Sequence, residues 1–388
     1  MTDVLARDYQ VLAESPDPQN VFAGSPALAK LPGGRLVATH DWFRTDPNKE
    51  KIPNQGQVLT SDDGGCTWVK RASTDLMWAS PFALGEVLYL IGNKPGSREI
   101  AIARSQDGGE SWTPESILFE GRYTNAPTSV IERDGFVYRA FETCTPGNDT
   151  WKSLVVAADV SKDLLAPAAW RMSNHVPYPG TPGSFKQGED PQGLYPPDAA
   201  RSICEDGWLE GNVVEVASRL RVILRVRMQG EATAGVCAVC DVADDGRRLT
   251  NRFAQFYPMA GGQCKFHIIK DGAMGLYWTA TTPPTDSFQP PGPLWDRGFR
   301  GSPGNERRAL TLMYSRDALN WFQAGFVSIS PSPMESFSYA SLLADGDDLL
   351  VVSRTSRAGK NQHDTNLITL HRVRDFRQLV PEGFAAES

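Results

Sequence analysis

The sequence predicts an all-β protein made of six similar units, and three observations lead to this prediction. Its 388 residues include 35 glycines and 28 prolines, which favour frequent turns and leave few long helical runs. A turn motif containing aspartate, glycine and tryptophan recurs, and so does a pair of apolar strands joined by a short turn. Six units of about four strands each indicate a six-bladed β-propeller, with seven blades possible if residues 151–207 hold another unit.

The turn motif has two well-formed copies, TSDDGGCTWVK at 60–70 and RSQDGGESWTP at 104–114, and a weaker copy, YSRDALNWFQ, at 314–323. Its aspartate is expected to accept hydrogen bonds from backbone N–H groups two or three residues later, while the glycine supplies a positive φ. The tryptophan then enters the next strand and packs against the neighbouring unit. We therefore assign these aspartates a structural role.

The paired strands open each unit with a small polar residue, an apolar strand, a short turn and a second strand rich in β-branched or aromatic residues. These pairs begin near residues 24, 79, 125, 211, 265 and 338. We expect one propeller domain over residues 1–388. The N-terminal stretch DYQVLAES is expected to supply the outer strand of the last blade and so close the ring.

Composition excludes several classes of function. A net charge of −7, with 40% hydrophobic and 22% charged residues, is typical of a globular protein and argues against nucleic acid as the main partner. No window approaches 18 uninterrupted apolar residues, so no membrane span is predicted. The N-terminus lacks the apolar core of a signal peptide, which predicts a cytoplasmic protein or a secreted one with its leader removed. The sequence does not predict the oligomeric state.

Motifs for cofactor or metal chemistry are absent from the sequence. Cys237 and Cys240 form a C-x-x-C pair without a second pair, so we interpret them as buried thiols in a strand. No glycine-rich phosphate loop follows a predicted strand, and neither an H-E-x-x-H motif nor an EF-hand loop is present. We therefore expect no cofactor and no metal.

The long connections of the predicted propeller gather on one face of the disc. In a four-stranded meander, the second-to-third connections and the links between blades share one face, and the turn motifs lie on the other. The long segments on the first face are 42–56, 177–207, 283–307 and 356–366. Function usually resides in long loops on a rigid scaffold, so this face is expected to carry the site.

Residues that open each first strand or end each second strand should point into a common mouth on that face. From the strand openings come Trp78, Asn125, Glu210, Asn212, Gln263, Lys265, His267 and Tyr339. From the second-strand ends come His40, Asp41, Arg44, Glu142, Arg225, Arg227 and Arg354, and His363 enters from a loop. This charged set with aromatic walls suits a polar, partly anionic ligand such as a sugar acid.

The repeated turn resembles the Asp-box (BNR) repeat of the sialidase-like β-propellers. In sialidases, a tyrosine that opens the last blade acts as nucleophile and is activated by a glutamate that opens an earlier blade. SYASL places Tyr339 in the first position, and LEGNVVEV places Glu210 in the second. A phenol is a poor nucleophile without an adjacent base. Arg225 or Arg227 resembles one of the three arginines that hold the sialic carboxylate.

The sequence departs from the sialidase pattern at other positions. AGSP places Gly24 where the first-blade arginine belongs, no arginine opens the fifth blade, and the region of the acid/base aspartate reads THDWF. Incomplete carboxylate capture argues against a true sialidase. A histidine beside a tyrosine and a cation also resembles the sites of propeller-type polysaccharide lyases, including those that act on rhamnose–glucuronate linkages. His40, Tyr339 and Glu210 are thus the candidate catalytic residues.

Two classes of function remain open from the sequence. The first is a carbohydrate-active enzyme that cleaves a glycosidic bond at or next to an acidic sugar of an oligosaccharide or glycan, by hydrolysis or by β-elimination. The second is a propeller without catalytic activity that binds a glycan or a protein through the same mouth.

Overall fold

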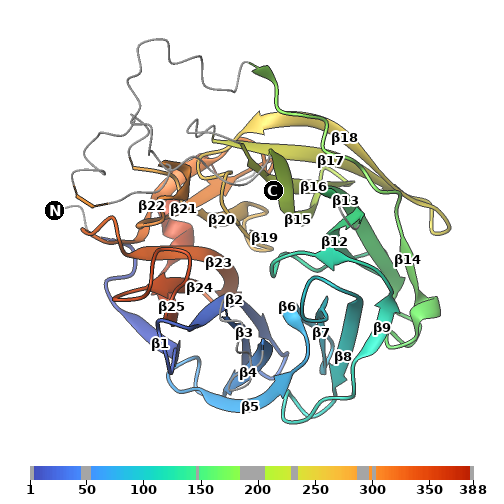
Figure 1. Cartoon of the computed structure of the whole chain (residues 1–388), viewed down its shortest axis with the longest axis horizontal. Coiled ribbons are helices and arrows are strands. Elements are labelled where there is room, and N and C mark those ends of the chain that lie inside the picture. Colours follow the sequence, from blue (N-terminus) through green and yellow to red (C-terminus); the bar gives the residue numbers. More distant parts are fainter. Residues whose placement is uncertain are drawn as a thin grey trace.

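The computed structural model describes residues 4–44, 54–145, 148–183, 206–228, 235–285, 297–298 and 303–384. These residues form six antiparallel sheets around a common axis, which confirms the predicted six-bladed propeller (Figure 1). In each sheet the strands follow one another as a meander, and the innermost strand lies next to the axis.

The first three blades are built from the N-terminal half of the chain. Blade 1 contains β2 (Val21–Lys30), β3 (Leu36–Arg44), β4 (Gln55–Ser61) and β5 (Val69–Thr74). Blade 2 contains β6 (Met77–Leu84), β7 (Val87–Asn93), β8 (Ile100–Ser105) and β9 (Ser116–Phe119). Blade 3 contains β10 (Tyr123–Thr124), β11 (Ile131–Arg133), β12 (Phe136–Thr145), β13 (Asn148–Asp159) and β14 (Trp170–Met172).

The last three blades complete the ring. Blade 4 contains β15 (Gly207–Val216), β16 (Arg219–Arg227), β17 (Val236–Asp244) and β18 (Leu249–Pro258). Blade 5 contains β19 (Ile268–Lys270), β20 (Tyr277–Thr281), β21 (Ala309–Ser315) and β22 (Phe322–Ile329). Blade 6 contains β23 (Ser336–Asp345), β24 (Asp348–Ser356), β25 (Leu367–Val373) and β1 (Tyr9–Glu14).

The ring is closed by its two ends. β1 pairs antiparallel with β25, so the N-terminal strand becomes the outermost strand of the last blade. Helical segments of the described residues include short 3-10 turns at Pro167–Ala169, Pro303–Asn305 and Phe376–Leu379. None of the described helical segments has the length and apolar character needed to cross a membrane.

The core lies between adjacent blades, and each of the six interfaces has its own cluster of buried apolar side chains. The two-residue period of a strand explains this arrangement, because successive side chains point to opposite faces of the sheet. On β16, Val222 and Leu224 pack toward blade 3, while Ile223 between them packs toward blade 5. Full burial of such a side chain contributes roughly 1.5–3 kcal/mol.

The repeated turns are held by their serine and aspartate side chains. Ser61 Oγ accepts a hydrogen bond from Gly65 N at 2.9 Å, and Asp63 accepts one from Thr67 N at 2.8 Å. The second copy repeats this pattern from Ser105 to Ser111. In both copies an N–H four residues after the aspartate is bonded, and in the first copy the backbone of Cys66, three residues after Asp63, also hydrogen-bonds to it. In the weaker copy, Asp317 accepts from residues two and three later, as expected.

Four innermost strands carry the same irregularity near the mouth. Each has a break in pairing with its neighbouring strand and, at that break, a non-glycine residue in the left-handed region. These residues are Ser25 (φ 52°), Trp78 (53°), Glu210 (60°) and Tyr339 (55°). Such bulges re-aim side chains and cost backbone energy, so they cluster at functional sites.

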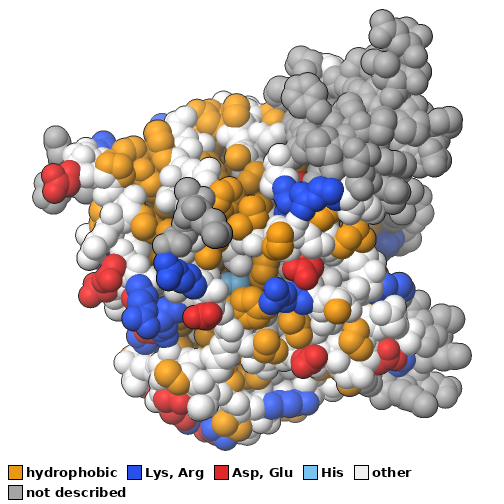
Figure 2. Space-filling model, turned by 90° about the vertical axis from the view of Figure 1, so that its left-hand side faces the viewer, with side chains coloured by type: hydrophobic (Ala, Val, Ile, Leu, Met, Phe, Trp, Pro, Cys, Tyr) orange, Lys and Arg blue, Asp and Glu red, His pale blue; other side chains and the backbone are white. Residues whose placement is uncertain are grey.

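One side of the surface carries mixed charge, and the two thiols of the C-x-x-C pair are buried as predicted. On the side drawn in Figure 2, basic and acidic side chains are interspersed with apolar ones and form no broad patch of one sign. Cys237 and Cys240 are buried in β17, where burial raises the pKa of each thiol to about 12. No cluster of metal-ligating side chains occurs among the residues that the structure describes.

Candidate functional site

The mouth cavity is a pocket of about 320 Å³ at one end of the propeller axis. All four left-handed bulge residues line it, because the bulges direct their side chains toward this opening. The other lining residues are Phe43, Arg44, Asn54, Met77, Gly96, Thr124, Asn125, Ala126, Leu209, Arg354 and His363. Blades 1, 2, 3, 4 and 6 therefore contribute to one site from segments far apart in the sequence.

A single guanidinium joins the two residues predicted to be nucleophile and base. Arg225 Nη1 lies 2.7 Å from Glu210 Oε2 and donates to Tyr339 Oη at 2.8 Å. Burial favours a neutral Arg225, but the Glu210 carboxylate and the Tyr339 phenol beside it act together in the other direction, and the pKa of the guanidinium is raised. The sequence thus correctly brought Tyr339, Glu210 and Arg225 together, although they lie on blades 6 and 4.

Two further arginines lie over the ring of Tyr339. The Arg354 Cζ is 4.7 Å from the ring centroid, and the Arg307 Cζ is 5.4 Å from it. Arg354 is 4% exposed and Arg307 is 5% exposed. Neither side chain forms an ion pair within 4.0 Å with a carboxylate among the described residues, although Asp364 and Glu210 lie near enough to act on Arg354 electrostatically.

Asp41 lies directly behind the wall formed by two bulge residues. Its Oδ2 accepts a hydrogen bond from Trp78 N at 2.8 Å, and Ser25 also hydrogen-bonds to this carboxyl. Burial raises the pKa of Asp41 to about 7, so much of it is protonated near neutral pH. Asp41 therefore reaches the cavity through Ser25 rather than directly.

Glu142 and Lys265 hydrogen-bond to the residues that follow two of the bulge residues, Glu210 and Tyr339. Glu142 Oε1 accepts from Gly211 N at 3.0 Å, next to Glu210, and burial raises the pKa of its carboxyl to about 8. Lys265 Nζ donates to Ala340 O at 2.7 Å and to Ser341 Oγ at 3.0 Å, next to Tyr339, while burial lowers its pKa to about 7. Both were predicted to bind ligand, but the structure gives them positioning roles.

The two predicted asparagines are buried between strands. Asn125 lines the mouth cavity, but its Nδ2 donates to Ala140 O at 2.5 Å. Asn212 joins blades 4 and 5, because its Nδ2 donates to Phe266 O and its Oδ1 accepts from Ile268 N. Asn212 therefore does not face the mouth cavity, which corrects its assignment to ligand binding.

Of the remaining polar candidates, two line the mouth cavity and two do not. Arg44 and His363 line the cavity, and the half-exposed His363 places its Nδ1 2.8 Å from Asp364 Oδ1. Gln263 instead donates to Thr282 O at 3.0 Å, and Arg227 lies beside Gly207 at the outer end of β16. Gln263 and Arg227 are not among the residues that line the cavity.

His40 is placed away from the mouth, which corrects its prediction as a catalytic residue. On β3 it shares a face with Ala38, which packs toward blade 6, whereas Asp41 faces blade 2. The His40 ring packs edge-on against Trp42 at 4.7 Å, and its Nδ1 is buried without a hydrogen-bond partner among the described residues. Burial lowers the pKa of His40 to about 4, so the ring is neutral at pH 7.

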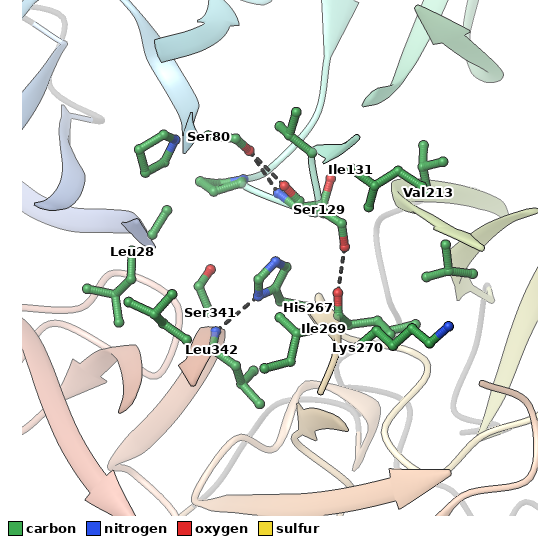
Figure 3. A pocket seen from close by; sticks show the side chains of 18 of the residues that line it. Leu28, Ser80, Ser129, Ile131, Val213, His267, Ile269, Lys270, Ser341 and Leu342 are labelled. Carbon is green, nitrogen blue, oxygen red and sulfur yellow. Dashed lines mark hydrogen bonds between the residues drawn. The ribbon is translucent and has the colours of Figure 1, made fainter. Parts of the chain in front are cut away.

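His267 belongs to a second cavity, of about 400 Å³, at the opposite end of the axis (Figure 3). Its Nδ1 accepts a hydrogen bond from Leu342 N at 3.0 Å, and its neighbours in this opposite cavity include Leu28, Val213 and Ile269. The prediction that His267 faces the mouth is therefore wrong. The reason is register: β19 begins only at Ile268, so the mouth end of blade 5 lies at earlier residues.

Sequence reasoning missed Arg307 and the role of the bulges. Arg307 lies two residues before β21 and was assigned to the long segment 283–307 without a role. The bulges leave a signal in the sequence, because Trp78, Glu210 and Tyr339 are each followed by alanine or glycine and then by serine or asparagine. Gly211 shows why the middle residue is small, since a Cβ there would lie 2.6 Å from Val222 Cγ1. Most of segments 42–56, 177–207 and 283–307 lies outside the described residues.

Solved structures provide the comparison with known proteins. A Trypanosoma rangeli sialidase in complex with sialic acid matches at 14% identity with a TM-score of 0.62. The match covers 96% of this chain and 59% of that one, so this chain spans about three fifths of the sialidase's length. The fold is that of the sialidase-like propellers.

Other matches place the chain within a wide range of such propellers. The Hadza microbial sialidase Hz136 matches at 14% identity with a TM-score of 0.61, covering 95% of this chain and 68% of that one. A Penicillium chrysogenum alpha-L-arabinanase complexed with arabinobiose matches at 13% identity with a TM-score of 0.53, covering 96% and 100%. No protein-family model and no curated protein matches this chain.

Proposed function

We propose that this protein is a glycoside hydrolase that removes an acidic sugar, with Tyr339 as nucleophile and Glu210 as its base. The observation that carries the proposal is the shared contact of Tyr339 and Glu210 with Arg225 Nη1 in the mouth cavity. This contact holds a phenol beside a carboxylate, and an adjacent base is what a phenol needs to attack. The buried cationic side chains of Arg307 and Arg354 beside the Tyr339 ring favour an anionic sugar.

The proposed reaction has two steps. The Tyr339 oxygen attacks the anomeric carbon and the glycosidic C–O bond breaks, while the phenolic proton passes to Glu210. The departing oxygen takes a proton from Asp41 through the Ser25 hydroxyl, a path consistent with the raised pKa of Asp41. Water then displaces Tyr339 from the sugar, returning one proton to Asp41 while Glu210 returns its proton to the tyrosine. Two displacements predict retention of anomeric configuration.

The test is turnover of acidic glycosides by the full chain. Wild-type protein is incubated with 4-methylumbelliferyl glycosides of N-acetylneuraminate, glucuronate and galacturonate, together with matched neutral glycosides. We expect fluorescence release from an acidic glycoside, with the product first formed seen by NMR in the retained configuration. Inversion would rule out Tyr339 as nucleophile. Failure to cleave any glycoside, together with binding of an acidic sugar, would identify a binding propeller instead.

Elimination is a second candidate because of one feature of the cavity wall. His363 pairs with Asp364 and lies among the lining residues with Arg354 and Tyr339, so a histidine does reach the site although His40 and His267 do not. A histidine next to a cation can remove the proton alpha to a uronate carboxylate. Oligosaccharides with glucuronate and galacturonate linkages separate the reactions, since elimination forms an unsaturated product that absorbs in the ultraviolet and hydrolysis does not.

A further inference from the structure

We propose that the opposite cavity is a second binding site, which takes a small neutral molecule with an apolar body and one hydrogen-bond acceptor. The inference goes beyond the proposed function, because it concerns other residues and needs no reaction in the mouth cavity. Three features carry it: apolar walls supplied by all six blades, hydroxyl groups that are already bonded to the protein, and an N–H of His267 that is not.

The opposite cavity has the size and composition of a small-molecule site. Its volume of about 400 Å³ lies within the range that such sites usually occupy. Each blade contributes at least one apolar side chain to its wall; these include Leu28, Pro81, Ile131, Val213, Ile269 and Leu342. Contact with these walls would remove the apolar body of a ligand from water, which is favourable.

The hydroxyl groups in the wall are used by the fold. Ser80 Oγ, Ser129 Oγ and Ser341 Oγ each donate to a backbone carbonyl of another segment, at 2.9, 2.6 and 2.8 Å. Thr128 Oγ1 does the same at 2.8 Å, and the Tyr277 hydroxyl donates to a backbone carbonyl of blade 4. Because these protons are committed to joining segments of the protein, a ligand needs another donor.

The His267 ring supplies that donor. Its Nδ1 accepts a hydrogen bond from Leu342 N at 3.0 Å, so this nitrogen carries no proton. Burial and the nearby charge of Lys265 lower the pKa of His267 to about 3, so the ring is neutral at pH 7 and its proton is on Nε2. Nε2 is turned away from Leu342 and has no hydrogen-bond partner among the described residues (Figure 3). This N–H favours an occupant that brings an acceptor.

The charges around the opposite cavity favour a neutral occupant. Of its charged lining residues, Glu132 and Lys270 are exposed, and Glu215 lies 3.2 Å from the Arg133 guanidinium. An ionised ligand inside would therefore lose its hydration without meeting a buried counter-ion of the described lining, which is costly. An apolar wall with one donor instead matches a molecule such as a ketone, an ester or an ether.

The test uses two matched pairs of probes and the full chain. Each pair compares a ketone with the alkene of the same shape that lacks the acceptor: acetophenone with α-methylstyrene, and cyclohexanone with methylenecyclohexane. Each probe is titrated by NMR into wild-type protein, His267→Asn and His363→Asn. The first variant can still accept a hydrogen bond from Leu342 N but has no donor at the Nε2 position. The second makes the same change on the wall of the mouth cavity and is the matched control.

We expect wild type and His363→Asn to bind at least one ketone about fivefold or more tightly than its alkene, the scale of one hydrogen bond. His267→Asn should bind that ketone and its alkene alike, with the affinity for the alkene unchanged. Intermolecular NOEs from the bound ketone to the methyl groups of Leu28, Val213 and Ile269 should place it in the opposite cavity. In wild type, the Nε2–H resonance of His267 should shift with the ketone and not with the alkene.

The other outcomes overturn the inference in distinguishable ways. If no probe binds, or if NOEs come only from methyl groups elsewhere, the opposite cavity is not a binding site. If wild type binds each ketone and its alkene alike, or the Nε2–H resonance does not respond to the ketone, His267 does not select an acceptor. A folded His267→Asn that keeps the preference would assign the donor to another group. None of these measurements depends on turnover of a glycoside, which decides the proposed function separately.

Discussion

The two ends of the propeller axis are built from the same innermost strands, yet they have opposite chemical character. The mouth cavity contains Tyr339, Glu210 and Arg354 and is surrounded by buried charges. The opposite cavity is lined mainly by apolar side chains, and His267 is hydrogen-bonded there to a backbone N–H. The chemical character of the side chains changes at the bulges of the four innermost strands. Residues at the bulge line the mouth cavity, and residues beyond it pack between the blades.

The difference shows how a repeated scaffold makes a site that has no sixfold symmetry. Beyond the bulge, alternate residues pack between blades under the same constraint in every unit. At the bulge, the left-handed backbone points one side chain toward the axis, and that side chain is free to differ between blades. Ser25, Trp78, Glu210 and Tyr339 occupy equivalent breaks in pairing and have unrelated chemistry. Strain at these four positions is a common feature, and function arises from their differences.

The largest expected effect is a loss of activity when a residue of the mouth cavity is changed, compared with almost no loss when a residue of the opposite cavity is changed. Removing the phenolic oxygen in Tyr339→Phe is expected to lower kcat/KM on the cleaved acidic glycoside by about 100-fold or more, since the ring remains but the nucleophile is lost. His267→Ala, at the other end of the axis, is expected to keep kcat/KM within about twofold. Instead, it should lower the free energy of unfolding by about 1–2 kcal/mol, because Leu342 N loses its acceptor. A large loss of activity in folded His267→Ala would move the reaction toward the opposite cavity.

The next effect is the pH dependence of folding stability, which Asp41 near the mouth and His267 in the opposite cavity should change in opposite directions. Asp41 has a pKa of 3.8 in an unstructured chain and about 7 in the fold, so the unfolded chain holds fewer protons between these values and stability falls as pH rises. Asp41→Asn removes the free-energy cost of burying the ionised carboxylate, and the asparagine oxygen can still accept a hydrogen bond from Trp78 N. Urea denaturation should therefore show the variant gaining on wild type from pH 4 to pH 8, reaching on the order of 2 kcal/mol.

His267 is expected to give the opposite slope. Burial lowers its pKa from 6.5 to about 3, so the unfolded chain holds more protons between these values and this group's contribution falls with falling pH. The destabilisation caused by His267→Ala should therefore shrink as pH falls below 6.5. Parallel stability curves for either variant and wild type would show that its group does not titrate differently in the fold.

The sequence predicted the scaffold well because the determinants of the scaffold are local. The turn repeats, the alternation of apolar residues and the closing strand are each visible within about ten residues, and they define six blades. Tyr339 and Glu210 were placed in the mouth because each stands near the start of an innermost strand, and the resemblance to sialidases supplied their expected roles. Their placement needed only the order of strands and a common direction.

The other site residues were misplaced or missed because their positions depend on strand register and on which face of a strand each side chain points to. The sequence does not reveal either. His40 and Asp41 are neighbours on β3, so only one of them can face blade 2, and the sequence does not say which. His267 was misplaced because the innermost strand of blade 5 is short and begins late. Arg307 was missed because its contact with Tyr339 joins the end of a long connection to another blade.

The smallest expected effect is a change in stability caused by backbone strain at one bulge residue, Ser25. Ser25→Ala and Ser25→Gly both remove the hydroxyl near Asp41, but only glycine relieves the left-handed backbone, at φ 52°. Thermal unfolding should therefore show the glycine variant to be more stable than the alanine variant by about 1 kcal/mol. At Ala27, two residues further along β2 and outside the left-handed positions, Ala27→Gly should lower stability, as glycine normally does in a strand. If glycine is no better than alanine at position 25, the bulge stores no strain, and its conformation follows from packing alone.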